Sequence, residues 1–328
     1  MNVEQARRYI IEQVAKMDSS YEEFEVQFMG GEPLMEFPLI REVSEWLWQQ
    51  NFQIPLVQIF ISTNGTLLSE SMKSWFSQNK ERICMGLSFD GTRLMQNVNR
   101  CDSAAIVDLR YFASTWPRQS VKMTLSPATL PHLYSGVQFL YESGFNEIAV
   151  DLAMGKNMGW KQEHLRVLSE QLTLLENFYL ANPSFSLISM LDIDVLQPLR
   201  KNSRIKKCSC GEQLVCVDCD GQEYACHLFS PVVATREQAS ASQRIVFSNH
   251  EQFISEQCKT CLLASVCTMC YGMNYICNGS VSEQFAFTCQ AFKIQYLIAC
   301  DLQCRRANSR GDKVCVQQIK NVLEQFKK

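Results

Sequence analysis

The feature that most constrains this chain is the placement of its cysteines. Eleven of the 16 cysteines lie between Cys208 and Cys289, and only Cys84 and Cys101 come before that stretch. A secreted disulfide scaffold is usually short, cysteine-rich throughout and preceded by an export signal. The charged N-terminal segment of this chain contains no apolar signal-peptide run. We therefore expect a cytoplasmic protein whose clustered thiols bind metal.

The spacing of these cysteines favours metal or cluster binding. They occur as Cys208-x-Cys210-x5-Cys216-x2-Cys219-x6-Cys226, then as Cys258-x2-Cys261-x5-Cys267-x2-Cys270, and then singly at Cys277 and Cys289. A Cys-x2-Cys turn places two sulfurs on one ion or cluster, and four thiolates complete either a zinc site or a four-iron (4Fe-4S) cluster. Spacing alone leaves both open. Because this stretch has few periodic apolar runs, bound metal would supply cross-links that its side chains do not.

The first half of the chain alternates helical and strand patterns. Apolar residues recur with a 3.6-residue period from Val3 to Met17 and with a two-residue period from Phe24 to Phe28. Further strands are expected at 57–62, 83–89, 120–125 and 146–152, with helices near 36–50, 68–78, 103–114, 130–143 and 161–181. Strands and helices in this order predict βαβ crossovers in a parallel sheet or barrel. With only five strands counted, a closed eight-stranded barrel is not expected.

The pattern changes near residue 195 to short segments broken by Cys, Gly, Asp and Ser, and helical patterns return near 290–307 and 313–327. We predict an α/β domain over 1–195 and a cysteine-rich domain with C-terminal helices over 196–328. A net charge of −3 and a pI near 5.9, without a basic stripe, argue against a nucleic-acid partner. No apolar stretch is long enough to span a membrane, so none is expected as a partner.

Polar turns follow three successive strands of the first half. Gly-Gly-Glu-Pro at 30–33 follows the first, Ser-Thr-Asn-Gly at 62–65 the second and Ser-Phe-Asp-Gly at 88–91 the third. The carboxyl ends of parallel strands are where α/β folds bind ligands. The two glycines permit close backbone approach, and Glu32 offers a carboxylate to an ammonium group. Asp90 is a candidate contact for ligand or substrate, although Asp-Gly is equally typical of a turn.

This ordered set of motifs, with Asn99-Arg100 and the segment 122–127 after it, resembles the radical S-adenosylmethionine (SAM) fold. The likeness covers nearly the whole chain and implies a partial (β/α) barrel that lacks its first strand. In that family the glycine–glutamate turn holds the methionyl amino group, and later polar residues contact the ribose and carboxylate. The residues that the resemblance implies for SAM binding are Gly30, Gly31, Glu32, Ser62, Asn64 and Ser88.

The cysteine pattern resembles the SPASM domain, which follows many peptide-modifying radical SAM enzymes and carries two auxiliary 4Fe-4S clusters. The resemblance rests on Cys210-x10-Gly221-x4-Cys226, on the run that begins at Cys258, and on a later Cys289. It implies one cluster on Cys210, Cys216, Cys226 and Cys270, and another on Cys258, Cys261, Cys267 and Cys289. Two residues separate Cys267 from Cys270 where the family usually has three. Cys208, Cys219 and Cys277 therefore stay open as alternative ligands.

One element of the radical SAM family is not found in the sequence. Its Cys-x3-Cys-x2-Cys loop, which follows the first strand and holds the catalytic cluster, has no counterpart, since residues 1–83 contain no cysteine. One expectation is that the coding sequence continues upstream of Met1 and supplies both the strand and the loop. The other is a protein that no longer generates radicals.

The resemblance as a whole implies a peptide or protein maturase similar to the anaerobic sulfatase-maturating enzymes. Such an enzyme modifies a peptide side chain by radical chemistry and draws electrons from a reductant such as flavodoxin or ferredoxin. Its cofactors would be SAM, two auxiliary 4Fe-4S clusters and, with an upstream loop, a third, catalytic cluster. The alternatives are a non-catalytic iron–sulfur protein that binds peptides or transfers electrons, and a zinc-stabilised interaction module.

Overall fold

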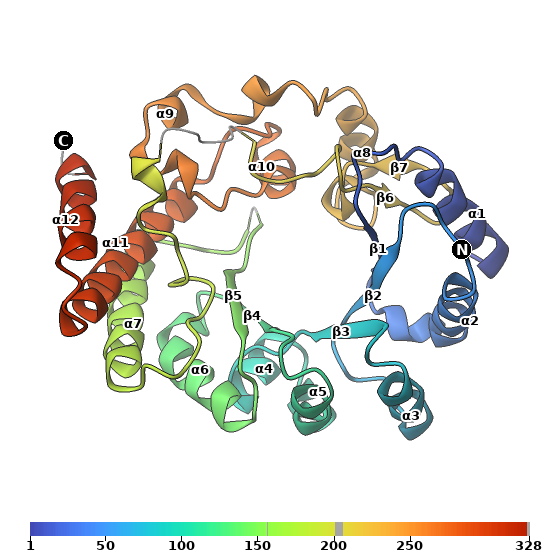
Figure 1. Ribbon diagram of the computed structural model, residues 1–328, viewed down its shortest axis with the longest axis horizontal. Helices are drawn as coiled ribbons and strands as arrows, with labels where there is room; N and C mark the ends of the chain where they lie inside the picture. Colours follow the sequence, from blue (N-terminus) through green and yellow to red (C-terminus); the bar gives the residue numbers. More distant parts are fainter. Residues whose placement is uncertain (156, 201–205, 327–328) are drawn as a thin grey trace.

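Five parallel strands form an open arc at the centre of the computed structural model, which describes residues 1–155, 157–200 and 206–326 (Figure 1). β1 pairs with β2, β2 with β3, and β4 with β5, and a bridge between Ser88 and Lys122 links the two sheets. The strands are β1 Phe24–Phe28, β2 Leu56–Thr63, β3 Ile83–Leu87, β4 Val121–Leu125 and β5 Ile148–Leu152. The expected parallel α/β architecture is therefore confirmed.

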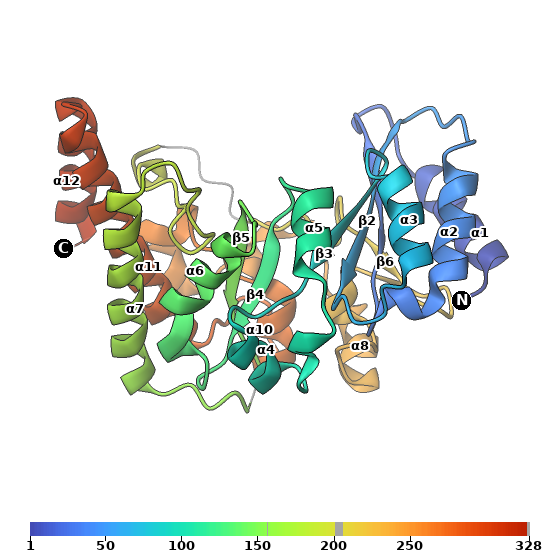
Figure 2. The ribbon, with the colours of Figure 1, turned by 90° about the horizontal axis from the view of Figure 1, so that it is seen from below.

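Helices cover the outer, convex side of the arc (Figures 1 and 2). Helix α6 packs closely on β4 at Gly136, where a Cβ would lie 2.8 Å from the Met123 side chain. The helices of this half are α1 Val3–Val14, α2 Phe37–Leu47, α3 Glu70–Gln78, α4 Arg93–Asn99, α5 Leu109–Thr115, α6 Leu133–Glu142 and α7 Gln162–Ala181.

The structure differs from the sequence-based expectation between residues 92 and 115. The helix expected over 103–114 is divided into a short 3-10 turn, Ser103–Ala105, and α5, which begins only at Leu109. The division has a local cause: Asp108 caps α5 by accepting a hydrogen bond from the Tyr111 amide at 3.1 Å. Helix α4 was not predicted, and Thr92 caps its start in the same way.

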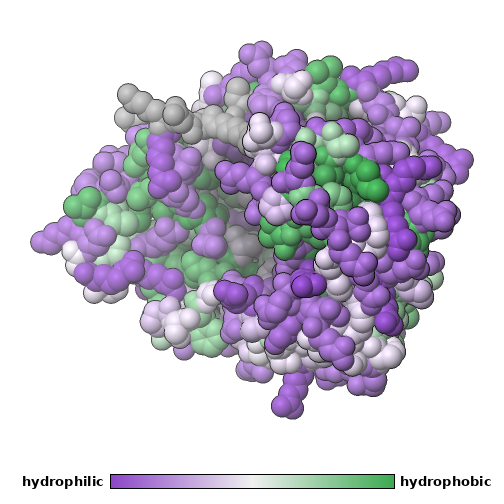
Figure 3. Space-filling model, turned by 45° about the vertical axis from the view of Figure 1, so that its right-hand side comes forward, coloured by the Kyte–Doolittle hydropathy of each residue, from purple (hydrophilic) through white to green (hydrophobic). Residues whose placement is uncertain are grey.

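The two faces of the strands differ in polarity. In β4, Val121, Met123 and Leu125 are buried against the helices. Lys122 projects from the opposite face and pairs with Asp151 of β5, with 3.4 Å between Nζ and Oδ2. The inner side of the arc is therefore open to polar ligands, and Figure 3 shows the molecule hollowed near the middle of one face.

The cysteine-rich segment and the C-terminal helices lie across the open side of the arc (Figure 1). A two-stranded antiparallel hairpin carries Cys216 and Cys219, and α11 packs along α7. The elements are β6 Cys216–Val217, β7 Glu223–Tyr224, α8 Arg236–Ser242, α9 Glu256–Lys259, α10 Tyr271–Asn278, α11 Ala286–Ser309 and α12 Lys313–Phe326. The helix expected over 313–327 is thus present to Phe326, and residue 327 lies outside the described residues. Among the described helices, none combines the length and apolarity that a membrane crossing requires.

The described residues form two apolar cores. The larger one fills the space between strands and helices and includes Leu263 and Tyr296 from the C-terminal part. The smaller one is built around Phe229, Phe253 and Tyr271, within the cysteine-rich segment. The division into domains at residue 195 stays a prediction, because the larger core has members on both sides of it.

The N-terminal helix is held against the cysteine hairpin. Gln13 of α1 and Lys16, which lies just after the helix, both bind the carboxylate of Glu223 in β7, the former at 2.8 Å. Gly221 has a φ of 84°, which favours glycine, and a Cβ there would lie 2.4 Å from the Tyr9 hydroxyl. The glycine of the SPASM-like pattern is therefore required both by its turn and by the approach of α1.

The contact between α7 and α11 contains an acid that should make stability depend on pH. Burial, and after it the neighbouring Asp301, raises the pKa of Glu176 to about 7, although Arg305 lies 3.1 Å from its Oε1. In the unfolded chain the pKa returns to its ordinary value of 4.5. The folded state therefore holds a proton that the unfolded state loses, and stability falls as pH rises from 4.5 to 7. We expect this loss to be on the order of 2–3 kcal/mol.

The Glu176→Gln variant should lack this part of the pH dependence. The measurement is the free energy of unfolding in urea at several pH values between 4.5 and 8. The same slope in the wild type and the variant would show that Glu176 titrates normally in the folded protein.

Candidate functional site

The Gly-Gly-Glu-Pro turn is tied to the next strand by the carboxylate of Glu32. Its Oε1 accepts hydrogen bonds from the Thr63 hydroxyl at 2.7 Å and from the Leu34 amide at 3.1 Å, and its Oε2 accepts one from the Asn64 amide at 2.8 Å. The sequence suggested that Glu32 offers its carboxylate to a ligand ammonium. In the structure this carboxylate also holds two loops together, and its binding to a ligand ammonium stays a prediction.

Gly30 and Gly31 border open space. A Cβ built on either residue would meet no atom within 4 Å, and neither residue has a left-handed φ. Packing within the described chain therefore does not explain these glycines. The open space beside them can admit a ligand backbone or amino group.

The turns after β2 and β3 lie beside this space. Asn64 closes its own turn, since its Oδ1 accepts from the Thr66 amide at 2.9 Å. Ser88 donates its amide to the Thr63 carbonyl at 2.9 Å and bridges to Lys122 of β4. The backbone thus brings together the predicted residues of three turns at the carboxyl ends of β1, β2 and β3. Ser62 lies one residue before Thr63, on β2.

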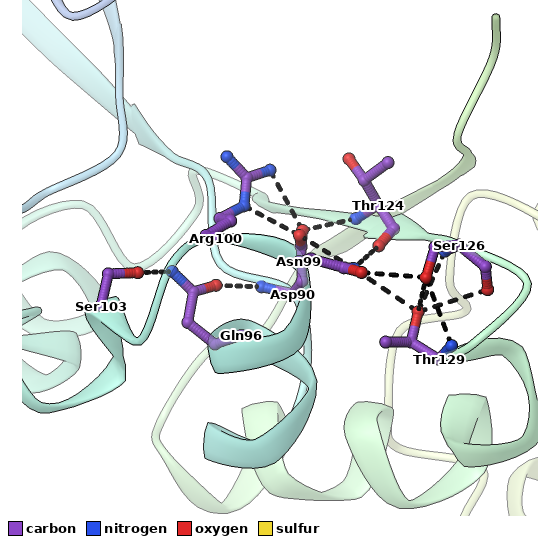
Figure 4. Close-up of polar contacts among 8 residues, drawn as sticks. All are labelled: Asp90, Gln96, Asn99, Arg100, Ser103, Thr124, Ser126 and Thr129. Atoms are coloured by element: carbon purple, nitrogen blue, oxygen red, sulfur yellow. Dashed lines mark hydrogen bonds and ion pairs between the residues drawn. The ribbon is translucent and has the colours of Figure 1, made fainter. Parts of the chain in front are cut away.

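Asp90 is the centre of a buried polar network (Figure 4). Its side chain is 2% exposed and binds Arg100 through two contacts, at 2.8 Å to Nε and 3.1 Å to Nη2. It also accepts from the Thr124 amide at 2.7 Å and from Asn99 Nδ2 at 3.2 Å. The carboxylate therefore anchors α4 to β4 and orients Arg100, whose side chain is 29% exposed. These contacts favour a positioning role for Asp90.

The four predicted ligands of the second cluster line one cavity. Cys258, Cys261, Cys267 and Cys289 share it with apolar residues and with Lys207 and Lys293 at its edge. Burial, with smaller contributions from the charges of the other three thiols, raises the pKa of Cys267 to about 11. Metal binding must therefore displace protons from these thiols. Lys293 opposes this effect at Cys289, because its positive charge favours the thiolate.

Cys208 interacts with thiols of the first predicted set. Cys208 lies with Cys210, Cys226 and Cys270: its sulfur accepts a hydrogen bond from Cys210, which with Lys206 lowers the pKa of Cys208 to about 6. Its charge also acts on the thiols of Cys226 and Cys270. For Cys216, burial and then Asp218 raise the pKa. These interactions make Cys208 an alternative to Cys216 in the first set.

All 16 cysteines are free thiols in the structure. Among the described residues, no three His, Cys, Asp or Glu side chains are close enough to hold a single metal ion. A four-iron cluster spreads its thiolates farther apart than one ion does, and a cavity lined by four thiols suits such a cluster. The donor set is purely sulfur, which also suits iron–sulfur chemistry.

Comparison with solved structures gives the class of fold. The chain superposes on native anSMEcpe with bound AdoMet with a TM-score of 0.67, 21% identity, and coverage of 94% of this chain and 89% of that one. The same protein with AdoMet and the Cp18Cys peptide gives 0.66 and 20% identity, over 94% of this chain and 90% of that one. SuiB of Streptococcus suis bound to S-adenosylmethionine gives 0.52 and 15%, over 88% and 70% of the two chains. The chain therefore shares the fold of anSMEcpe over nearly its whole length.

Sequence comparison adds two partial relatives. An uncharacterised protein of Methanocaldococcus jannaschii is 26% identical over 152 residues, 44% of this chain and 51% of its own length. The cysteine-type anaerobic sulfatase-maturating enzyme of Clostridium perfringens is 32% identical over 80 residues, 24% of this chain and 21% of its own length. The match thus spans about half of the first relative and a fifth of the second. A scan against models of known protein families finds no match.

Proposed function

We propose that this protein is a radical SAM peptide or protein maturase with two auxiliary 4Fe-4S clusters. The observation that carries the proposal is the cavity lined by Cys258, Cys261, Cys267 and Cys289, in a chain whose glycine turn at 30–33 borders open space. Structures of the same fold hold AdoMet and, in anSMEcpe, a peptide. These neighbours support a SAM site and a peptide substrate for this chain.

Some residues of the candidate SAM site would contact SAM, and others would position the contacting residues. Gly30, Gly31 and Glu32 would receive the amino group, and Ser62, Asn64 and Ser88 would lie along the ribose and carboxylate. Glu32 fixes the glycine turn and Asp90 orients Arg100, whose guanidinium can bind a carboxylate. With a third, catalytic cluster as electron source, bound SAM would supply the 5′-deoxyadenosyl radical that modifies the peptide side chain, and methionine would be released.

The first cluster would be held by Cys210, Cys226, Cys270 and one further thiol. The family pattern assigns Cys216, and the interactions of Cys208 make it the alternative. Both lie in the segment that forms the smaller apolar core. This segment would be the functional core of a domain spanning 196–328, with the barrel over 1–195.

The partners follow from this chemistry. The electrons would come from a small cytoplasmic donor such as flavodoxin or ferredoxin, and the substrate would be a peptide or protein segment that enters the polar inner side of the arc. The free thiols fit a reducing compartment, so we place the protein in the cytoplasm.

The test of the SAM site is a Gly31→Ala variant. Because the added methyl group meets no protein atom, the variant should keep the fold and the stability of the wild type. The methyl group would occupy the space of the SAM amino group, so the SAM dissociation constant should rise about tenfold, or about 1.4 kcal/mol. Calorimetric titration of reconstituted protein with SAM measures this. Equal affinity in both proteins would remove the glycine turn from the binding site.

The second candidate is a non-catalytic iron–sulfur protein that binds peptides or transfers electrons. The thiol-lined cavity fits it equally well, because holding a cluster does not require cleavage of SAM. Release of 5′-deoxyadenosine from SAM under reduction would exclude it, whereas SAM and cluster binding without this product would support it. A protein with zinc and no iron would instead be the zinc-stabilised module.

A further inference from the structure

A fully buried lysine lies next to the first set of thiols. The side chain of Lys206 is 0% exposed, although a lysine ammonium group is costly to remove from water. Its place in the chain is two residues before Cys208 and four before Cys210. Neighbouring groups must therefore compensate this charge, and their identity indicates the role of the lysine.

The compensation comes from one backbone carbonyl, one carboxylate and two rings. Nζ donates to the Cys210 carbonyl at 2.7 Å and to Glu212 Oε2 at 3.0 Å. It lies 5.6 Å from the ring centroid of Phe247 and 5.2 Å from that of Phe253. The Glu212 carboxylate also binds His250, with 2.6 Å between its Oε1 and His250 Nε2. The ammonium is thus fixed in position against the loop that carries Cys210.

We propose that Lys206 raises the reduction potential of the cluster held by Cys210 and its neighbouring thiols. This inference rests on the proposed function, since it needs a cluster at that position. A cluster on four thiolates becomes more negative when it accepts an electron from a one-electron donor, and no bond forms or breaks in that step. A fixed positive charge in a weakly polar interior stabilises the reduced form more than the oxidised form.

The hydrogen bond to the Cys210 carbonyl gives the lysine a second effect. It holds the backbone of a ligand residue, so the charge and the cluster keep a constant separation. Lys206 is therefore a positioning residue that acts on the cluster through its charge and through the ligand loop. A neutral side chain that keeps the hydrogen bond separates these two effects.

The experiment compares the full chain with its Lys206→Gln, Lys206→Arg and Glu212→Gln variants after anaerobic reconstitution. Iron and sulfide are measured first, and each cluster is then titrated with dithionite while its paramagnetic signal is followed. In Lys206→Gln the ratio of reduced to oxidised first cluster should fall about tenfold at a given potential, a shift of about 59 mV to more negative values. Lys206→Arg should match the wild type, and Glu212→Gln should shift the potential in the positive direction. The cluster of the Cys258 cavity should not shift and serves as the internal control.

Each outcome decides the matter. Full iron content with equal first-cluster potentials in wild type and Lys206→Gln would overturn the inference and leave the clusters in place. Equal shifts in Lys206→Gln and Lys206→Arg would also overturn the inference, because the potential would then not depend on the charge of residue 206. If the Lys206→Gln protein loses the first cluster, the first-cluster potential of the Glu212→Gln protein becomes the test. A potential equal to that of the wild type would then overturn the proposal. A wild type without iron would contradict the proposed function itself.

Discussion

Replacing Cys261 by alanine is expected to lower the iron content from about eight to about four atoms per chain, because one of two four-iron clusters loses a ligand. Cys261 shares its cavity with Cys258, Cys267 and Cys289. The same change should loosen the C-terminal part, because the cysteine-rich segment has only a small apolar core of its own. Iron and sulfide analysis, with limited proteolysis of the C-terminal part, measures both effects.

The matched control is Cys101→Ala, which removes an exposed thiol far from either set in the sequence. It should keep all the iron. Equal loss in both variants, or none in either, would contradict the ligand assignment. The same assay applied to Cys208→Ala and Cys216→Ala identifies the fourth ligand of the first set, since only the true ligand should halve the iron.

The Asp90→Asn variant is expected to lose about 3 kcal/mol of stability, the size found when one partner of a buried ion pair is removed. The carboxylate is almost wholly buried and accepts bonds from Arg100, Asn99 and the Thr124 amide. An amide of the same shape leaves the Arg100 charge uncompensated beside α4 and β4. The free energy of unfolding in urea measures the loss.

Asp102→Asn makes the same chemical change at a control position. Asp102 is exposed, has a φ of 56° and makes no capping hydrogen bond, and asparagine is also tolerated in that conformation. Its stability should stay within about 0.5 kcal/mol of the wild type. If Asp90→Asn were equally mild, the polar network would be incidental to the fold, and the account of how Arg100 is oriented would be wrong.

The strands and the polar turns could be predicted because their signals are local. Alternation of apolar residues from Phe24 to Phe28 marks β1, and glycine with polar residues marks the turn that follows it. Parallel strands then bring such turns together without further information. The break before α5 was missed although its signal is also local, since Asp108 is a typical N-cap residue.

The partners of individual side chains could not be predicted in this way. The carboxylate of Asp90 binds the amide of Thr124, 34 positions away, and Cys208 acts on Cys270 across the cysteine-rich segment. Such pairs depend on how the loops pack against each other in three dimensions. Residue spacing in the sequence does not predict this packing. The same holds for Lys206, whose burial beside Cys210 has no signature in hydrophobic periodicity.

The central claim is that the chain holds two four-iron clusters on its cysteine-rich segment. Its most direct test is the elemental and sulfide content of the wild-type protein, isolated or reconstituted without oxygen. The account predicts about eight iron and eight sulfide per chain and a brown protein, because eight thiols complete two four-ligand sites. About two zinc per chain, with no iron or sulfide, would contradict it.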